Sequence, residues 1–133
     1  MDQLSTQQQR IKQIVQLAKQ MPGIEVLWLY GSQARGNANT SSDYDLAIAF
    51  KTYIEGPVER RLRPELLALE WEKQLDIELS IVDINQAVLS LAYTVVGDNT
   101  VIYCQNNYRR MIEEQKIMSK WELDYLYHRK HYA

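Results

Sequence analysis

The sequence contains a single cysteine, Cys104, among its 133 residues, so no disulfide can form within the chain. It lacks any apolar run near the ~20 residues that span a bilayer, and residues 1–13 hold no signal-peptide stretch. The formal net charge is only −2, which gives no strong attraction to nucleic acid or to anionic membranes. These absences favour a cytoplasmic protein, and 46% apolar residues suffice for one folded domain over residues 1–133.

Hydrophobic periodicity divides the chain into helices and strands. Helical spacing predicts helices over residues 4–21, 57–74, 85–96 and about 107–130. Short apolar or alternating runs predict strands over residues 24–30, 44–50, 75–84 and 100–104. Pro64 predicts a kink or restart in the second helix, whereas Asn85 and Gly97 predict the start and end of the third. We therefore expect an α/β or α+β fold, with a small mixed sheet flanked by helices and a C-terminal helical segment.

The stretch GSQARGNANTSSDYDLAIAF, from Gly31 to Phe50, joins the first two predicted strands. Because strand side chains alternate, Asp43 and Asp45 share one face with small alanines, which leaves open space above the strand. Two carboxylates this close repel each other unless a cation lies between them, and their hard oxygens suit Mg²⁺. Magnesium also neutralises phosphates that the aspartates would otherwise repel, so the pair indicates a phosphate-handling site.

A Gly-Ser turn precedes the two aspartates. Gly31 has no Cβ, so a triphosphate can approach its backbone closely. If Ser32 opens a short helix, its hydroxyl and the first-turn N–H groups form an anion site, and Arg35 one turn later can reach a phosphate. The stretch is neither a P-loop, since no Gly-Lys-Ser/Thr occurs, nor an EF-hand. A lone Gly-Ser or Asp-x-Asp is common in loops, so the hypothesis depends on the joint arrangement.

That arrangement resembles a known family. Gly-Ser at 31–32, ten intervening residues and Asp-Tyr-Asp at 43–45 match the motif of the polymerase-β-type nucleotidyltransferase superfamily. With its opening YGSQARG, the short chain is similar to the minimal nucleotidyltransferases, the antitoxin partners of HEPT-domain toxins in prokaryotes. The resemblance covers about residues 24–104. It implies Mg²⁺, ATP as substrate, and transfer of AMP to a hydroxyl, in some members a toxin tyrosine, within a hetero-oligomer with the toxin.

The resemblance also implies a third acid on a neighbouring strand, as a metal ligand and as a base for the attacking hydroxyl. Asp76, Glu78 and Ser80 share one face of the predicted strand 75–84. An ungapped match puts Ser80 where the family has an acid, so this chain departs from the pattern. Glu78 is the first candidate and Asp76 the second, while two acids alone, or acids on a solvated face, remain open. Asp83 has the other parity and is expected in a turn.

The expected site is thus a set of seven residues. The catalytic candidates are Asp43, Asp45 and Glu78. The nucleotide-binding candidates are Gly31, Ser32, Arg35, Asp43 and Asp45. The metal-binding candidates are Asp43, Asp45, Asp76 and Glu78.

Two other functions remain open. The serine at position 80 allows an antitoxin that blocks its partner by contact, without catalysis. A nucleotidyltransferase for a small molecule such as an antibiotic is less favoured, because no segment beyond the minimal domain builds a second substrate pocket. In the C-terminal segment, core packing is the first expectation and partner contact the second for one rough apolar stripe: Tyr108, Met111, Ile112, Met118, Trp121 and Tyr125.

Overall fold

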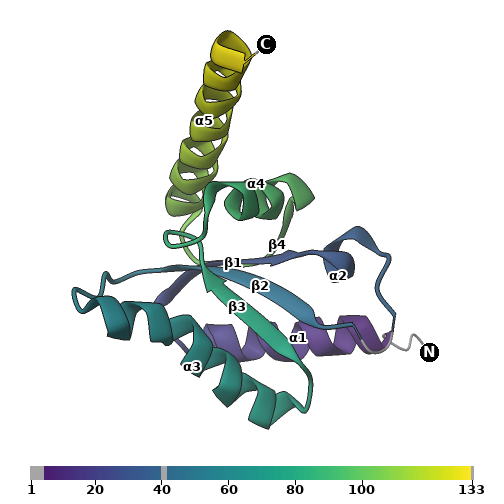
Figure 1. The fold of residues 1–133 in the computed structure, drawn as a ribbon. Coiled ribbons are helices and arrows are strands. Elements are labelled where there is room, and N and C mark those ends of the chain that lie inside the picture. The colour runs from purple at the N-terminus through teal and green to yellow at the C-terminus, as the bar shows by residue number, and fades with distance from the viewer. Residues whose placement is uncertain (1–4, 40–41, 133) are drawn as a thin grey trace.

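The computed structural model describes residues 5–39 and 42–132 of the chain. Helices and strands alternate along it, as Figure 1 shows. Their order is α1 (Thr6–Lys19), β1 (Ile24–Tyr30), α2 (Ser32–Arg35), β2 (Tyr44–Phe50), α3 (Pro57–Leu75), β3 (Leu79–Asp83), α4 (Leu89–Asp98), β4 (Thr100–Cys104) and α5 (Asn107–Tyr132).

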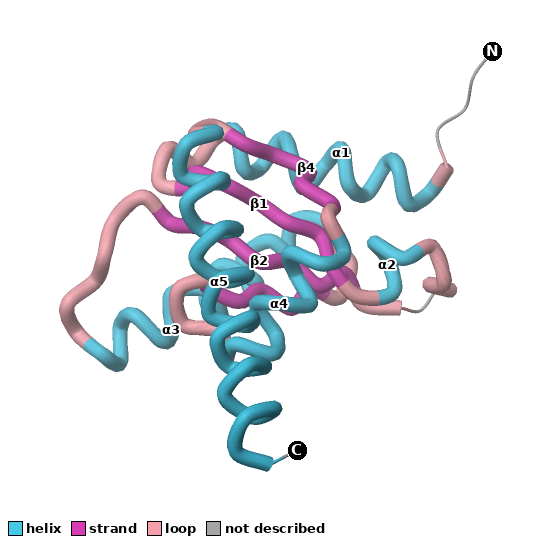
Figure 2. The backbone as a smooth tube through the Cα atoms, turned by 90° about the horizontal axis from the view of Figure 1, so that it is seen from above, coloured by secondary structure: helices cyan, strands magenta, loops and turns pink. Residues whose placement is uncertain are grey.

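The strands form one four-stranded mixed sheet in the order β3-β2-β1-β4. The central strand β1 is antiparallel to β2 and β4, whereas β2 and β3 are parallel. Helices α1 and α3 cover one face of the sheet, and α4 and α5 lie on the other (Figures 1 and 2). The expected small mixed sheet flanked by helices is confirmed.

Two core clusters follow from the alternation of side chains along the central strands. Leu27 and Leu29 of β1 pack with α1 and α3, whereas Val26 and Trp28 pack with α4 and α5. All four side chains are at most 1% exposed, so both faces of the sheet are dry around β1. The sheet is therefore a rigid support for the loops at its ends.

The strand expected over residues 75–84 is shorter, and this part of the prediction is wrong. Helix α3 continues through Leu75, and Asp76 ends it in the left-handed conformation with φ of 52°. The Glu72 carboxylate then accepts a hydrogen bond from the Leu79 backbone N–H at 3.0 Å, where β3 begins. Residues 75–78 instead comprise the end of α3 and the link to β3, and four residues are too few for alternation to distinguish this from a strand.

Two helix boundaries also differ from the expectation, for local reasons. Helix α3 runs through Pro64 without a break, and the carbonyl of Arg60, which proline cannot bond, accepts a hydrogen bond from the Gln86 side chain at 2.9 Å. Helix α4 begins at Leu89 rather than at Asn85 and ends beyond Gly97, with Asn99 as its left-handed cap. Residues 83–87 instead form a turn around Asp83, as expected for that residue.

The C-terminal helix α5 projects away from the sheet over its second half (Figure 1). Core packing, expected for its apolar stripe, is wrong for most of it: Tyr108, Met118 and Tyr125 are 69%, 43% and 58% exposed. Trp121 alone of the stripe stacks on another helix, with its ring 4.3 Å from that of Tyr93. Among the described residues, no helix is both long and apolar enough to cross a membrane.

The central position of β2 predicts the effect of truncating its core side chains. Leu46 is fully buried against α1 and α3, so Leu46→Ala should lower the free energy of unfolding by about 2–5 kcal/mol in urea titrations. Leu69→Ala on α3 is the matched control, because Leu69 is 55% exposed and its loss should cost less than about 0.5 kcal/mol. Equal effects of the two substitutions would contradict this packing.

Candidate active site

The turn after β1 requires glycine. Gly31 has φ of 77° and precedes the short helix α2, whose Ala34 and Arg35 backbone N–H groups both donate to the Gly31 carbonyl at 3.1 Å. A Cβ at this position would lie 2.6 Å from the Asp45 Oδ2 atom, so any side chain would collide with that carboxylate. The absence of a side chain therefore lets the carboxylate of Asp45 lie directly against the backbone of the turn.

The two aspartates stand at the start of β2, on the sheet face that α4 covers. Asp45 pairs with Tyr30 of β1, and Asp43 lies two residues earlier and is exposed. Burial raises the pKa of Asp45, the charge of Asp43 raises it further, and Arg35 partly offsets both. Burial, followed by the charge of Asp45, also raises the pKa of Tyr30 to about 12, so that hydroxyl stays neutral. The Asp43 and Asp45 carboxylates thus concentrate negative charge at the start of β2.

A third carboxylate, that of Glu78, lies beside Asp43. The β2–β3 register pairs Tyr44 with Leu79, and the Tyr44 N–H donates to the Glu78 carbonyl at 3.0 Å. A hydrogen bond between the Asp43 and Glu78 carboxyl groups, and then the charge of Asp43, raises the pKa of Glu78. The carboxyl groups of Asp45 and Glu78 therefore hold their protons more tightly in the folded chain than in the unfolded chain. Because of this difference, the stability of the folded state falls as the pH rises through the titration of these two groups.

The same register accounts for the other acid candidates. Ser80, not an acid, is the β3 residue that pairs with Asp45. Asp76 does not share a strand face with Glu78, contrary to the expectation, because it caps α3 before the strand begins. Within residues 5–39 and 42–132, no three Asp, Glu, His or Cys side chains are arranged so that they could hold a metal ion by themselves.

One residue of the site, Asp98, was missed from the sequence. At the end of α4, its Oδ2 atom accepts a hydrogen bond from the Gly31 backbone N–H at 2.8 Å, and its Oδ1 atom lies 3.1 Å from Arg35 Nε. Asp98 thus links the glycine turn to the arginine. No sequence signal distinguished it, since the helix was expected to end at Gly97.

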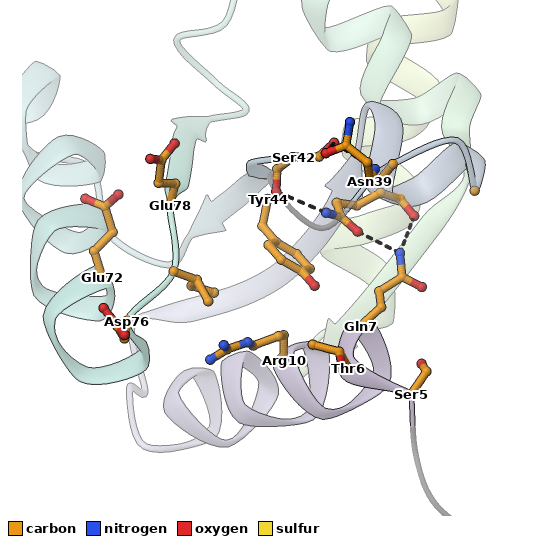
Figure 3. Close-up of a pocket in the computed structure, with 14 residues that line it drawn as sticks. Ser5, Thr6, Gln7, Arg10, Asn39, Ser42, Tyr44, Glu72, Asp76 and Glu78 are labelled. Carbon is orange, nitrogen blue, oxygen red and sulfur yellow. Dashed lines mark hydrogen bonds between the residues drawn. The ribbon is translucent and has the colours of Figure 1, made fainter.

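A cavity of about 970 Å³ adjoins the acids from the opposite face of the sheet. Tyr44 alternates away from its neighbouring aspartates and points into this cavity toward Arg10 (Figure 3). Gln7 donates to the Gln33 side chain at 2.8 Å across one side of it. Of the three clustered carboxylates, only that of Glu78 lines this cavity, so the aspartate pair and the cavity are separate features.

Comparison with known proteins identifies the family. Residues 12–108 match the family model described as polymerase beta, nucleotidyltransferase. The chain belongs to this nucleotidyltransferase family. The match spans most of the chain and includes the glycine turn, both aspartates and Glu78.

This nucleotidyltransferase is also similar to individual proteins. It is 30% identical over 95 residues to the protein adenylyltransferase MntA of Aphanizomenon flos-aquae (strain 2012/KM1/D3), covering 67% of this chain and 63% of that protein. The alignment thus spans less than two thirds of the curated relative.

Solved structures share the fold at lower identity. One, a toxin–antitoxin with AMP-PNP, has a TM-score of 0.72 at 19% identity and covers 90% of this chain and 93% of its own. Another, a tri-AMPylated Shewanella oneidensis HEPN toxin in complex with MNT antitoxin, has a TM-score of 0.68 at 18% identity, with 94% of each chain covered.

The charge cluster predicts a coupled titration. Asp43→Asn removes the charge that raises the pKa values of both Asp45 and Glu78, so both values should fall in a carboxyl-carbon NMR titration. Glu72→Gln is the matched control: Glu72 raises the pKa of Glu78 least among the causes and is not among the causes for Asp45. If Asp43→Asn left both pKa values in place, the three carboxylates would not form one cluster.

Proposed function

We propose that this nucleotidyltransferase transfers AMP from ATP to a hydroxyl of a partner protein, a tyrosine of a cognate HEPT-type toxin, and thereby neutralises it. The proposal is carried by one observation: the Asp45 carboxylate lies directly against a side-chain-free turn, and the Asp43 and Glu78 carboxyl groups interact beside it. Family membership and the adenylyltransferase name of the cyanobacterial relative support it. The toxin–antitoxin context of the structurally similar chains agrees with a toxin as partner.

The donor set fits Mg²⁺. Magnesium in phosphate-handling sites is bound by one or two carboxylates, with substrate phosphates and water as the other ligands, rather than by a complete protein cage. Asp43 and Asp45 meet this requirement, and their mutual repulsion is relieved by a cation. We therefore propose Asp43 and Asp45 as ligands, with Glu78 as the third acid. When bound, the ion neutralises charge on the phosphates and on the leaving pyrophosphate.

The remaining roles in AMP transfer are triphosphate binding and proton acceptance. Gly31 and Ser32 hold the triphosphate, and Arg35 binds a phosphate from the exposed side. The acceptor oxygen attacks the α-phosphorus, the bond from this phosphorus to the bridging oxygen breaks, and pyrophosphate leaves. Glu78 accepts the hydroxyl proton, a role that its raised pKa favours. Positioning and charge neutralisation account for most of the expected rate enhancement.

One observation supports a second candidate, a contact-blocking antitoxin without catalysis. Ser80 faces Asp45 across β2 and β3, at the place where the family resemblance implied an acid. With a weakened metal site, the chain would neutralise its partner by binding alone.

Mass spectrometry of the partner separates these functions. Incubation with ATP, Mg²⁺ and the cognate toxin should add the mass of AMP, and Asp43→Ala/Asp45→Ala should lower that rate at least about 10³-fold. Neutralisation that survives the double substitution, with no added mass, would support the contact blocker instead.

Single substitutions in the same assay test the third acid. Glu78→Gln should lower kcat by about 10²-fold or more, because it removes the proton acceptor. Asp76→Asn is the matched control, since Asp76 is exposed at the helix cap, and its kcat should stay within roughly twofold. The opposite ranking would transfer the role to Asp76.

Asp98 should act as a positioning residue for ATP. Asp98→Ala leaves the Gly31 N–H without its acceptor and releases Arg35, so KM for ATP should rise about tenfold while kcat changes little. Asp98→Asn keeps an acceptor for Gly31 and should have a smaller effect. A fall in melting temperature with an unchanged KM in both variants would reduce Asp98 to a structural role.

A further inference from the structure

A second cavity, of about 590 Å³, lies at the other end of β2 from the aspartate pair. Its lining comes from the end of β2, the connection into α3, α3 itself, the turn after β3 and the start of α5. Phe50 at this end is five residues from Asp45, or roughly 16 Å along an extended strand. The cavity is therefore distinct from the catalytic site.

The lining of this cavity is strongly basic. It holds four cationic side chains and one carboxylate: Lys51, Arg60, Arg63, Arg109 and Asp83. In a chain with a formal net charge of −2, such a cluster is a local reversal of sign. We call these five residues the basic cavity.

Carboxylates compensate only part of this positive charge. Arg109 lies 3.1 Å from Glu25 and 3.0 Å from Glu113, so its charge is balanced. Arg63 lies 3.6 Å from Asp83. The two remaining cations have no carboxylate within ion-pair distance in the described part of the chain.

The Arg60 guanidinium has neutral partners only. Its NH1 group donates to the Tyr53 hydroxyl at 2.6 Å and to the backbone carbonyls of Ile54 and Glu55 at 2.8 and 3.3 Å. These bonds fix the guanidinium without cancelling its charge. Lys51 is exposed and adds a second uncompensated charge at the rim.

The arginines are held in place before any ligand arrives. The guanidinium carbon of Arg63 lies 3.9 Å above the centre of the Phe50 ring, and that of Arg60 lies 4.8 Å from the Tyr53 ring. The Nε atom of Arg63 is buried and has no hydrogen-bond partner within the described residues. Because this atom is enclosed, it does not itself reach a ligand, and the packing on Phe50 is what holds the Arg63 guanidinium in place.

We propose that the basic cavity is a second, non-catalytic binding site for a small phosphate-bearing anion, either a nucleotide or inorganic pyrophosphate. Fixed guanidinium groups match phosphate oxygens in geometry and in charge. The volume lies within the range of ~300–1,000 Å³ that is usual for small-molecule sites. The inference is independent of AMP transfer, because none of the five residues belongs to the proposed catalytic set.

Isothermal titration calorimetry with inorganic pyrophosphate tests the site. EDTA removes divalent ions, so the aspartate end repels the anion, and KCl holds the ionic strength constant. We expect saturable binding that Arg60→Gln and Lys51→Gln each weaken about tenfold. Arg61→Gln on the same helix is the matched control, since Arg61 is exposed and does not line the cavity.

Arg35→Gln should leave this binding unchanged, which separates the site from the proposed triphosphate site. A parallel titration with AMP distinguishes a nucleotide from inorganic pyrophosphate as the ligand. If AMP binds more tightly than pyrophosphate, the cavity is a nucleotide site, and if AMP binds more weakly, it is an inorganic-phosphate site. Lys51→Gln alters an exposed side chain, so its result does not depend on refolding of the core.

Three outcomes would overturn the proposal. The first is that neither pyrophosphate nor AMP binds saturably. The second is an equal loss in Arg61→Gln, or a loss in Arg35→Gln, which would indicate general charge effects or the catalytic end. The third is binding of a poly-glutamate peptide with no binding of pyrophosphate or AMP, which would indicate an acidic protein surface as the ligand.

Discussion

The contact between a bare backbone and a carboxylate is the constraint on which the site depends. Gly31 leaves no room for a Cβ, because Asp45 occupies that space. The arrangement needs a positive φ at Gly31, an aspartate at the matching position of β2, and antiparallel pairing that brings the two strands into register. Asp98 then fixes the turn from a third element by accepting the Gly31 N–H. Three segments, the turn after β1, the start of β2 and the end of α4, therefore define one small volume.

The sequence predicts the parts of this site that depend on local geometry. Alternation along residues 44–50 correctly placed Asp45 and Leu46 on opposite faces, because a strand admits only two orientations. The open space expected over the alanines on the Asp45 face is wrong, since Ala47 and Ala49 are fully buried and pack with α4. The family resemblance, carried by the spacing of the Gly-Ser and Asp-x-Asp pairs, is confirmed by the family match. Most of the strands of the buried sheet could also be predicted, because they are short apolar runs between clear turn signals.

Tertiary contacts determine the features of the fold and the site that the sequence did not predict. Pro64 remains inside α3 because Gln86, distant in sequence, bonds the carbonyl that proline leaves free. Glu72 ends the helix and starts β3 through one side-chain hydrogen bond, which displaced Asp76 from the strand. Asp98 belongs to the site because α4 ends beside Gly31, a long-range contact that local sequence does not indicate. Each case involves a polar side chain whose partner is chosen by the fold, and no periodicity encodes such a choice.

Net charge conceals a separation of charge along one strand. β2 begins between Asp43 and Asp45, where the pKa values of Asp45 and Glu78 are raised, and it ends at a cavity with two uncompensated cations. Composition averages these ends to −2, and that average governs only long-range attraction to large polyanions. At contact distance the local charges act, because a ligand there lies within the Debye length of about 8 Å at physiological ionic strength. Because β2 is negative at one end and positive at the other, it favours binding of cations at its first end and of anions at its second end, even though the whole chain is nearly neutral.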